Sequence, residues 1–505
     1  MKYRRKTSEK RATAVIDLFA GPGGLGEGFS AYRGRRGKRF SIALSIEKDA
    51  VAHSTLLLRS FKRQFRRVPE AYYARLRGEI TTSQLFEAYP DQADRASREA
   101  VCMELSPKSH VRTDRLVETV LAEKPGNWVL IGGPPCQAYS LVGRSRMKGA
   151  DAAAYERDGR HYLYREYLRI LRKFQPPIFV MENVKGILSS TVDGIQTFQE
   201  IVRDLKAAGY TLHSFVSTGS ETDDPSPGDY VIRSEDYGIP QRRHRVIVLG
   251  LRKGLARGEK VLAQERATIP IDDAIRDLPK IRSGLTGAHF DEQQWRSAVE
   301  STARIRASRS VGAAMPQLLR NRSPKSLGGD FLPKAIARAK MSGWLQKNSD
   351  WFLDRRVGGV LQHAARSHMY SDIQRYFFAA CYAKVHGRSP KLAEFPRRLW
   401  PAHRNAQAAA NGKMFSDRFR VQTKSRPATT VVSHIAKDGH YYIHYDPVQC
   451  RSLTVREAAR LQTFPDNYFF AGARTDQYHQ VGNAVPPLLA RQLAAIVADI
   501  LAQLD

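Results

Sequence analysis

The apolar run Trp-Val-Leu-Ile at residues 128–131 stops at Gly-Gly-Pro-Pro-Cys-Gln-Ala-Tyr-Ser, residues 132–140. Proline can neither extend a β-ladder nor occupy a helix interior, so this pattern predicts a buried strand that ends in a stiff loop. Cys136 then lies at the carboxyl end of a strand, which is where ligands bind in open α/β sheets. A lone cysteine is more often a small buried apolar residue, but in this position it is a candidate nucleophile.

Two apolar runs near the N-terminus predict further strands of the same sheet. Residues 14–20 lead into the glycine turn Gly-Pro-Gly-Gly-Leu-Gly at residues 21–26, and residues 40–46 end at Glu47. Glycines let a ligand approach the backbone, and the helix that follows offers N–H groups to an anion. A glutamate at the tip of the second strand is the usual partner of a nucleoside ribose. The turn lacks the G-x-G-x-x-G dinucleotide spacing, so a plain tight turn and a solvated glutamate are the alternatives.

Two later runs also carry polar residues at the ends of predicted strands. Residues 177–181 end at Glu182 and Asn183, and residues 246–249 follow Gln-Arg-Arg-His-Arg at residues 241–245. An acid at the end of a buried strand costs free energy unless it is bonded or functional, which favours a shared site. Alternate residues of a strand share a face, so Gln241, Arg243 and Arg245 would point together toward an anion or a polar ligand. A glutamate satisfied by backbone donors and an exposed charge run are the structural alternatives.

The remaining segments suggest an interrupted α/β domain with a second lobe. Residues from about 56 to 110 are predicted to form a helical insertion between strands two and three, and Asp114 is placed near the end of a short third strand. The α/β rhythm breaks at residue 251 and returns after residue 425, with a capped helix from residue 452 and a final helix at 488–504. The intervening stretch is rich in arginine with interleaved tryptophans, so we interpret it as a separate lobe with a basic face (Arg304, Arg306, Arg309, Arg320, Arg322, Arg397, Arg398, Arg404, Trp344, Trp351, Trp400).

The charge of the chain points to a polyanionic partner. It has 81 Lys and Arg against 50 Asp and Glu, a formal net charge of +31. Nucleic acid is favoured, because each neutralised phosphate releases counterions. A membrane surface is second, since no amphipathic basic helix, signal peptide or membrane span is evident. The four cysteines show no paired spacing, which predicts a reducing compartment, no disulfide framework and no metal site.

Six segments, taken in order, closely resemble the cytosine-C5 DNA methyltransferase family. They are Asp-Leu-Phe-Ala-Gly-Pro-Gly-Gly (17–24), Gly-Pro-Pro-Cys-Gln (133–137), Glu-Asn-Val (182–184), Gln-Arg-Arg-His-Arg (241–245), Arg-Glu-Ala-Ala-Arg-Leu-Gln (456–462) and Gly-Asn-Ala-Val-Pro-Pro (482–487). The resemblance implies an α/β fold: a Rossmann-like, S-adenosylmethionine-dependent methyltransferase domain at 1–250 and 426–505, with a variable target-recognition lobe at 251–425.

The resemblance also assigns site residues. Catalysis would fall to Cys136, Glu182, Asn183, Arg243 and Arg245. S-adenosylmethionine would contact Phe19, Ala20, Gly21, Gly23, Gly24, Glu47, Asp114, Pro135, Asn483 and Val485. DNA would contact Gln137, Ser140, Arg144 and Arg146.

The implied chemistry explains why these residue types are needed. The Cys136 thiolate adds to C6 of cytosine, and Glu182 in its acid form stabilises the charge that develops at N3. Asn183 would hold the base edge, and Arg245 the O2 side. Methylation at C5 and loss of the C5 proton then release the thiol. A stacked base is out of reach, so the cytosine must be flipped out of the duplex.

The expected partner is double-stranded DNA, and we expect a cytoplasmic monomer that serves a restriction-modification or phage-defence system. RNA cytosine methylation by the same chemistry is one alternative. A catalytically inactive DNA-binding module is another, although Cys136 and Glu182 are both present. A dinucleotide oxidoreductase lacks its fingerprint. Two segments depart from the family pattern: Asp114 rests on spacing alone, and the stretch around Asp158, Arg160 and Leu163 matches loosely.

Overall fold

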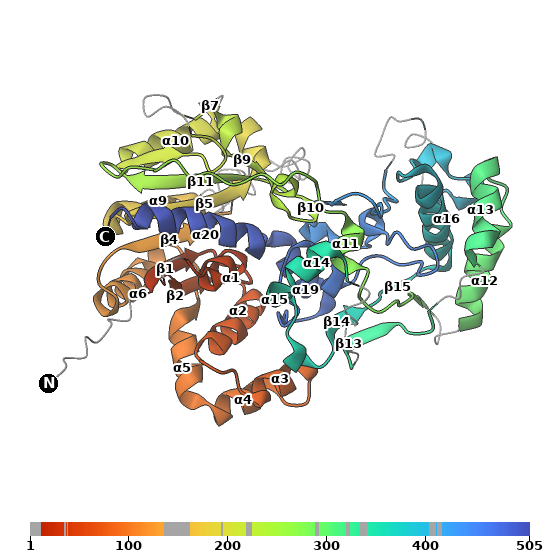
Figure 1. Ribbon diagram of the computed structural model, residues 1–505, viewed down its shortest axis with the longest axis horizontal. Helices are drawn as coiled ribbons and strands as arrows, with labels where there is room; N and C mark the ends of the chain where they lie inside the picture. The colour runs from red at the N-terminus through yellow and green to blue at the C-terminus, as the bar shows by residue number, and fades with distance from the viewer. Residues whose placement is uncertain are drawn as a thin grey trace.

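The computed structural model describes residues 12–34, 37, 39–135, 162–192, 195–218, 225–287, 292–319, 324–333, 341–402, 411 and 417–504. Five of the predicted site residues therefore lie outside the described residues: Cys136, Gln137, Ser140, Arg144 and Arg146. Figure 1 shows a larger lobe built on a β-sheet and a smaller lobe around α12 (Glu292–Ala303), α13 (Arg309–Leu319) and α16 (Tyr370–His386).

An open, twisted sheet with helices on both faces organises the larger lobe. Its strand order is β3-β2-β1-β4-β5-β11-β8, with β9 also paired to β11. Neighbours from β3 to β5 run parallel, whereas β11 is antiparallel to β5, β8 and β9. The order reverses between β1 and β4, and this switch point is where such sheets bind ligands. The strands are β1 (Thr13–Leu18), β2 (Phe40–Glu47), β3 (Ala100–Cys102), β4 (Trp128–Gly132), β5 (Ile178–Val184), β8 (Tyr210–His213), β9 (Val231–Arg233) and β11 (His244–Arg252).

The α/β prediction is confirmed, and five apolar runs form strands close to their predicted positions. The prediction of a third strand near Asp114 is wrong. The third strand is the three-residue β3, and Asp114 lies within helix α6 (His110–Glu123). A strand of three residues gives no period-two signal, which explains why the sequence pattern misplaced it.

Two helical layers cover the sheet. On one face α1 (Gly24–Ala31) and α20 (Pro487–Leu501) pack over the strands, and on the other face lie α6, α9 (Tyr162–Phe174) and α10 (Thr197–Ala207). By length and composition the helical stretch Arg474–Leu501 qualifies as a membrane span, contrary to the sequence-based expectation. In the fold, 78% of its apolar window is buried, as expected for the core helix of a globular domain.

The predicted helical insertion is confirmed. Four helices connect β2 to β3, namely α2 (Ala50–Arg63), α3 (Glu70–Arg77), α4 (Thr82–Ala88) and α5 (Pro90–Glu99). Local sequence sets their ends: the Asp49 carboxylate accepts the Ala52 N–H at the start of α2, and Thr81 with Gln84 forms a capping box at the start of α4. Figure 1 shows α3 to α5 below the sheet.

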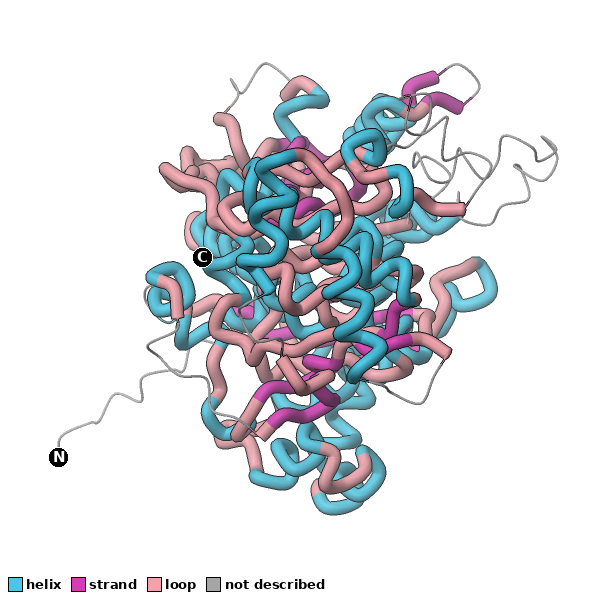
Figure 2. The backbone as a smooth tube through the Cα atoms, turned by 90° about the vertical axis from the view of Figure 1, so that its right-hand side faces the viewer, coloured by secondary structure: helices cyan, strands magenta, loops and turns pink. Residues whose placement is uncertain are grey.

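The smaller lobe has a hydrophobic core of its own, which includes Trp295, Tyr376 and Phe395. Figure 2 views this end of the molecule and shows helices and loops over most of it. Residues 341–364 turn back toward the larger lobe through α14 (Gly343–Lys347), α15 (Ser349–Phe352) and β14 (Val360–Ala364). The boundaries of the three predicted domains remain a prediction.

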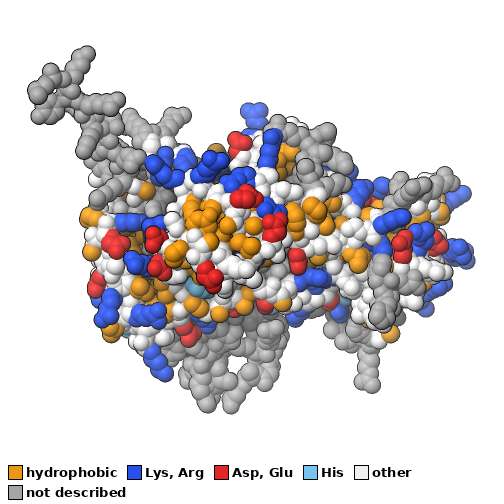
Figure 3. All heavy atoms as spheres, turned by 90° about the horizontal axis from the view of Figure 1, so that it is seen from below, with side chains coloured by type: hydrophobic (Ala, Val, Ile, Leu, Met, Phe, Trp, Pro, Cys, Tyr) orange, Lys and Arg blue, Asp and Glu red, His pale blue; other side chains and the backbone are white. Residues whose placement is uncertain are grey.

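The tryptophans of the arginine-rich stretch serve packing. The Trp344 and Trp351 indoles donate hydrogen bonds to the Gly238 and Thr463 carbonyls, and Trp400 packs against the core of the smaller lobe. The interpretation of a basic face interleaved with tryptophan is therefore wrong for these rings. The described arginines of that prediction are exposed (Arg304, Arg306, Arg309, Arg397, Arg398). On the face in Figure 3, basic side chains are spread along the molecule among acidic and hydrophobic ones.

Three more helices, which share one hydrophobic cluster, belong to the larger lobe and its junction with the smaller one. They are α11 (Ile271–Ile275), α18 (Val455–Leu461) and α19 (Arg474–Asn483). Thr454 and Glu457 form the capping box of α18, as the sequence predicts. A short parallel pair, β10 (Gln241–Arg242) and β16 (Ala428–Thr429), joins the end of the sheet to the segment before α18.

Candidate active site at the carboxyl edge of the sheet

The loop that leads to Cys136 starts against Glu182. β4 ends at Gly132, which pairs with β1 on one side and with β5 on the other. A Cβ added at Gly133 would lie 2.8 Å from Glu182 Oε2, so only glycine lets the loop pass the carboxylate this closely. Pro134 is buried and Pro135 half-buried, and the described chain stops there. The structure thus places Glu182 beside the start of the predicted nucleophile loop.

Glu182 and Arg245 form an ion pair at the end of adjacent strands. Glu182 Oε1 lies 2.8 Å from Arg245 Nε, and the two side chains are 13% and 14% exposed. The antiparallel register of β5 and β11 pairs Arg245 with Val184, which brings the guanidinium to the carboxylate. Burial lowers the pKa of Arg245, and the Glu182 charge opposes that shift. The sequence prediction that these two residues belong to one site agrees with this geometry.

The Asn183 amide, predicted to hold the edge of the base, is hydrogen-bonded to the protein backbone. Its side-chain Nδ2 donates to the Pro134 carbonyl at 3.1 Å, and its Oδ1 accepts the Val184 N–H at 2.9 Å. The residue is 6% exposed. Its amide therefore holds the first part of the Cys136 loop against β5, and we assign it a positioning role in place of base binding.

The Arg243 side chain is also buried and hydrogen-bonded within the protein. The expected continuous strand face is interrupted, because β10 ends at Arg242 and β11 begins at His244. Arg243 is 1% exposed, and its Nη1 donates to the Val431 carbonyl at 2.8 Å. Burial lowers the pKa of Arg243, and the charge of Arg245 lowers it further. The side chain ties the sheet to the segment before α18, so its predicted catalytic role becomes a structural one.

The glycine turn forms an open cradle at the end of β1. Phe19 and Gly21 both have φ of 56°, and Gly23 has φ of 92°. Glu47 Oε2 accepts the Gly21 N–H at 2.8 Å, and the Ala20 N–H bonds the Ile46 carbonyl. A Cβ at Gly21 would have nothing within 4 Å, so the turn leaves space on that side. These features fit a ligand that lies over Gly21 and beside Glu47.

Gly24, Asn483 and Val485 meet at the other side of this turn. A Cβ at Gly24 would collide with the Val485 carbonyl, so this glycine is required for packing against the chain between α19 and α20. Asn483 is exposed and Val485 is 5% exposed. Of the three, only Asn483 presents an exposed side chain to a ligand.

Two buried glutamines hold the chain between α19 and α20 in place. Gln462 Nε2 donates to the carbonyls of Val481 and Ala484 at 2.8 and 2.7 Å. Gln241 Nε2 donates to Gln462 Oε1, and Gln241 Oε1 accepts the Val431 N–H at 2.7 Å. Both glutamines are fully buried. They link the strand that carries the arginines to the segment that carries Asn483.

Asp114 lies outside this cluster, on α6. Its carboxylate pairs with Arg169 at 2.8 Å and Lys173 at 2.7 Å, both on α9, and these pairs lower its pKa against the opposing effect of burial. Its prediction as a cofactor residue rested on a strand that ends elsewhere. The acid that follows the true third strand is Glu104, which is exposed and lies 3.3 Å from Lys48. The pattern of an acidic residue directly after a strand could have identified Glu104 if β3 had been recognised.

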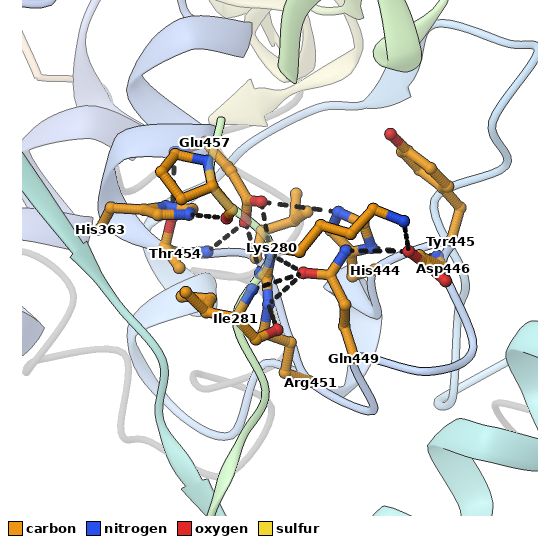
Figure 4. A network of polar contacts seen from close by, with 12 residues as sticks. Lys280, Ile281, His363, His444, Tyr445, Asp446, Gln449, Arg451, Thr454 and Glu457 are labelled. Carbon is orange, nitrogen blue, oxygen red and sulfur yellow. Dashed lines mark hydrogen bonds and ion pairs between the residues drawn. The ribbon is translucent and has the colours of Figure 1, made fainter. Parts of the chain in front are cut away.

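A cavity of about 720 Å³ lies where the two lobes meet. Its floor is a buried polar network in which Arg451 pairs with Glu457, and Glu457 faces His444 (Figure 4). The Glu457 carboxylate also accepts the Thr454 N–H. The same carboxylate therefore caps α18 and pairs with Arg451 at the junction. The lining of the cavity includes four exposed cations and two half-buried carboxylates (Arg276, Lys280, Lys384, Lys424, Asp272, Asp446).

Comparison with known proteins identifies the family. The sequence pattern of the C-5 cytosine-specific DNA methylase family matches residues 125–498. A type II methyltransferase of Bacillus paralicheniformis is 35% identical over 96% of this chain and 99% of its own length. A type II methyltransferase of Thalassovita gelatinovora is 26% identical over 96% and 98%, and a DNA (cytosine-5-)-methyltransferase of Aeropyrum pernix is 26% identical over 74% and 81%. This chain therefore belongs to the C-5 cytosine-specific DNA methylase family and is a DNA (cytosine-5-)-methyltransferase.

Proposed function

We propose that this methyltransferase modifies cytosine at C5 within a specific duplex DNA sequence and that the base binds at the Glu182–Arg245 pair. The observation that carries the proposal is the convergence of three motifs at one sheet edge: Gly133 beside Glu182, Glu182 beside Arg245, and Asn183 on the Pro134 carbonyl. The relatives named as type II methyltransferases support a role in restriction-modification.

In the proposed reaction the Cys136 thiolate forms a bond to C6 of the flipped cytosine. Electron density moves into the ring, and Glu182 in its acid form hydrogen-bonds N3 to stabilise the charge there. Arg245 fixes the Glu182 carboxyl group and faces the O2 side of the base. Asn183 fixes the start of the loop, because its amide donates to the Pro134 carbonyl. After C5 is methylated, a base takes the C5 proton, the electron pair of that bond forms the C5–C6 double bond again, and the Cys136 sulfur leaves C6 as a thiolate.

The family uses S-adenosylmethionine, and the glycine turn fits it. Gly21 and Gly23 would let its chain lie on the backbone, Glu47 would accept from the ribose hydroxyls, and Asn483 would close the other side. We replace Asp114 by Glu104 as the acid beside the adenine, because Glu104 follows the strand adjacent to β2. When bound, this cofactor supplies an electrophilic methyl group.

Bisulfite sequencing of DNA from cells that express the wild type and site variants tests the proposal. Cys136→Ser should abolish methylation, and Glu182→Gln should reduce its rate by about 10²- to 10⁴-fold, since a positioned acid contributes that much. The matched control is Glu235→Gln, which removes the carboxylate 2.8 Å from His244 at the same end of β11 but outside the site, and should methylate normally. Sustained methylation by Cys136→Ser would contradict the proposed nucleophile.

A further inference from the structure

The helical insertion contacts the turn that we propose as the cofactor site. Gly23, in that turn, has so little room that a Cβ there would lie 2.8 Å from Leu56 Cδ1 on α2 and 3.1 Å from the Tyr468 hydroxyl oxygen. Tyr468 is 1% exposed, and its hydroxyl donates a hydrogen bond to the Pro22 carbonyl. The turn is therefore fixed at two peptide groups, one on each side of the Gly21–Pro22 bond: Glu47 accepts the Gly21 N–H, and the Tyr468 hydroxyl donates to the Pro22 carbonyl.

Arg59 of the insertion helix α2 holds the ring of Tyr468. Its guanidinium carbon lies 4.7 Å from the ring centre, and its Nη1 donates to Asn467 Oδ1 at 2.8 Å. The same guanidinium forms a buried ion pair with Glu27, in the first turn of α1. Burial raises the pKa of Glu27, but the charges of Arg59 and Arg63 overcome that effect and lower it to about 2.

The chain of contacts continues into the outer helices of the insertion. Asn467 Nδ2 and the Tyr73 hydroxyl both donate to Asp354 Oδ2 at 2.8 Å. Arg75, also on α3, lies over the Phe469 ring at 4.8 Å. Residues 465–470, which include Tyr468, therefore contact both α2 and α3.

We propose that the insertion is a brace for the glycine turn and that Tyr468 is its positioning residue. The inference rests on the proposed cofactor site, because it assigns Tyr468 to the affinity of that site. A turn with two of its glycines at positive φ has many conformations available when it is free. Fixing the Pro22 carbonyl removes that freedom before the ligand binds, which increases affinity without a direct contact.

Titration calorimetry of the full chain with S-adenosylhomocysteine tests the brace. Tyr468→Phe removes one hydroxyl and should weaken binding by about 5- to 30-fold, the equivalent of one buried hydrogen bond. The matched control is Tyr210→Phe, since Tyr210 is equally buried and its hydroxyl also donates to a proline carbonyl, that of Pro176, at 3.1 Å. It should lose comparable thermal stability and keep the wild-type dissociation constant.

Each other outcome is decisive. If the wild type does not bind S-adenosylhomocysteine, both the cofactor site and the brace are overturned. If it binds and Tyr468→Phe binds equally well, or if both tyrosine variants weaken binding alike, only the brace is overturned. Should Tyr468→Phe fail to fold, Tyr73→Phe cuts the chain of contacts at Asp354, and the proposal then requires a smaller but measurable loss of affinity.

Discussion

Asp17 is a buried acid that the proposed chemistry does not use. It lies near the end of β1 and is 1% exposed, and no side chain among the described residues hydrogen-bonds its carboxyl oxygens. Burial raises its pKa to about 8, against the smaller opposing effect of Arg63. The folded chain therefore keeps a proton that the unfolded chain releases above its ordinary pKa of 3.8.

This residue predicts a specific dependence of stability on pH. Because the folded state binds the extra proton between about pH 4 and pH 8, stability falls as the pH rises through that window. Asp17→Asn removes the effect, so its advantage in unfolding free energy over the wild type should grow by about 2–4 kcal/mol between pH 5 and pH 8. Thermal unfolding at both pH values measures this. An advantage that stays constant over the same interval would show that Asp17 is already ionised in the fold at pH 5.

At the scale of elements, the two glutamines connect β10, α18 and the segment between α19 and α20. Gln462 is the central member, because its single amide nitrogen serves two carbonyls, those of Val481 and Ala484. These carbonyls flank Asn483, and the Val485 carbonyl of the same segment packs on Gly24. The position of the segment against the glycine turn therefore depends on one side-chain amide.

Gln462→Glu tests this connection with almost no change in volume. A carboxylate cannot donate to the two carbonyls, so we expect a loss of about 1–3 kcal/mol in unfolding free energy and a higher KM for S-adenosylmethionine. Gln422→Glu is the control, since Gln422 is 1% exposed and donates to the Tyr441 carbonyl at 2.7 Å without contacting that segment. A change in KM that is the same for both variants would remove Gln462 from the support of the cofactor site.

For the whole molecule, the net charge of +31 favours DNA binding, and part of the positive charge lies at the junction of the lobes. The rim of the junction cavity carries Lys280 and Lys424, whose side chains are 68% and 65% exposed. Lys280 lies 3.1 Å from Asp446 and Lys424 lies 3.8 Å from Asp272, and these two carboxylates are only 18% and 15% exposed. We predict that the two exposed ammonium groups exchange these carboxylates for DNA phosphates when a duplex binds at the junction of the lobes.

Salt dependence of DNA binding measures that exchange. Replacing Lys280 and Lys424 together with alanine should reduce the slope of log K against log salt by about 1–2, close to one unit for each lost phosphate contact. Lys260→Ala is the control, because Lys260 pairs with Asp499 on α20, outside the junction, and should leave the slope unchanged. An unaltered slope in the double variant would exclude this rim from the DNA interface.

The prediction from sequence succeeded where local chemistry is sufficient. A strand that ends in Glu-Asn or a run that stops at Gly-Gly-Pro-Pro carries its signal within a few residues, so the strands that carry Glu182 and Glu47 and the glycine turn before α1 were placed correctly. It failed for Asp114, because the three-residue β3 has no recognisable period, and for Trp344 and Trp351, because their indoles bond carbonyls of segments more than 100 residues away in the chain.

The sequence by itself determined the α/β class and the family, and it predicted the residues that carry chemistry, since these depend on short motifs and their order. Only the tertiary structure decided which polar residues face a ligand and which hold the protein together. Asn183, Arg243 and Gln241 belong to the same motifs as Glu182 and Arg245, yet their hydrogen bonds go to Pro134, Val431 and Leu461. A buried polar group must find a partner, and that partner is supplied by segments that folding brings together from distant parts of the chain.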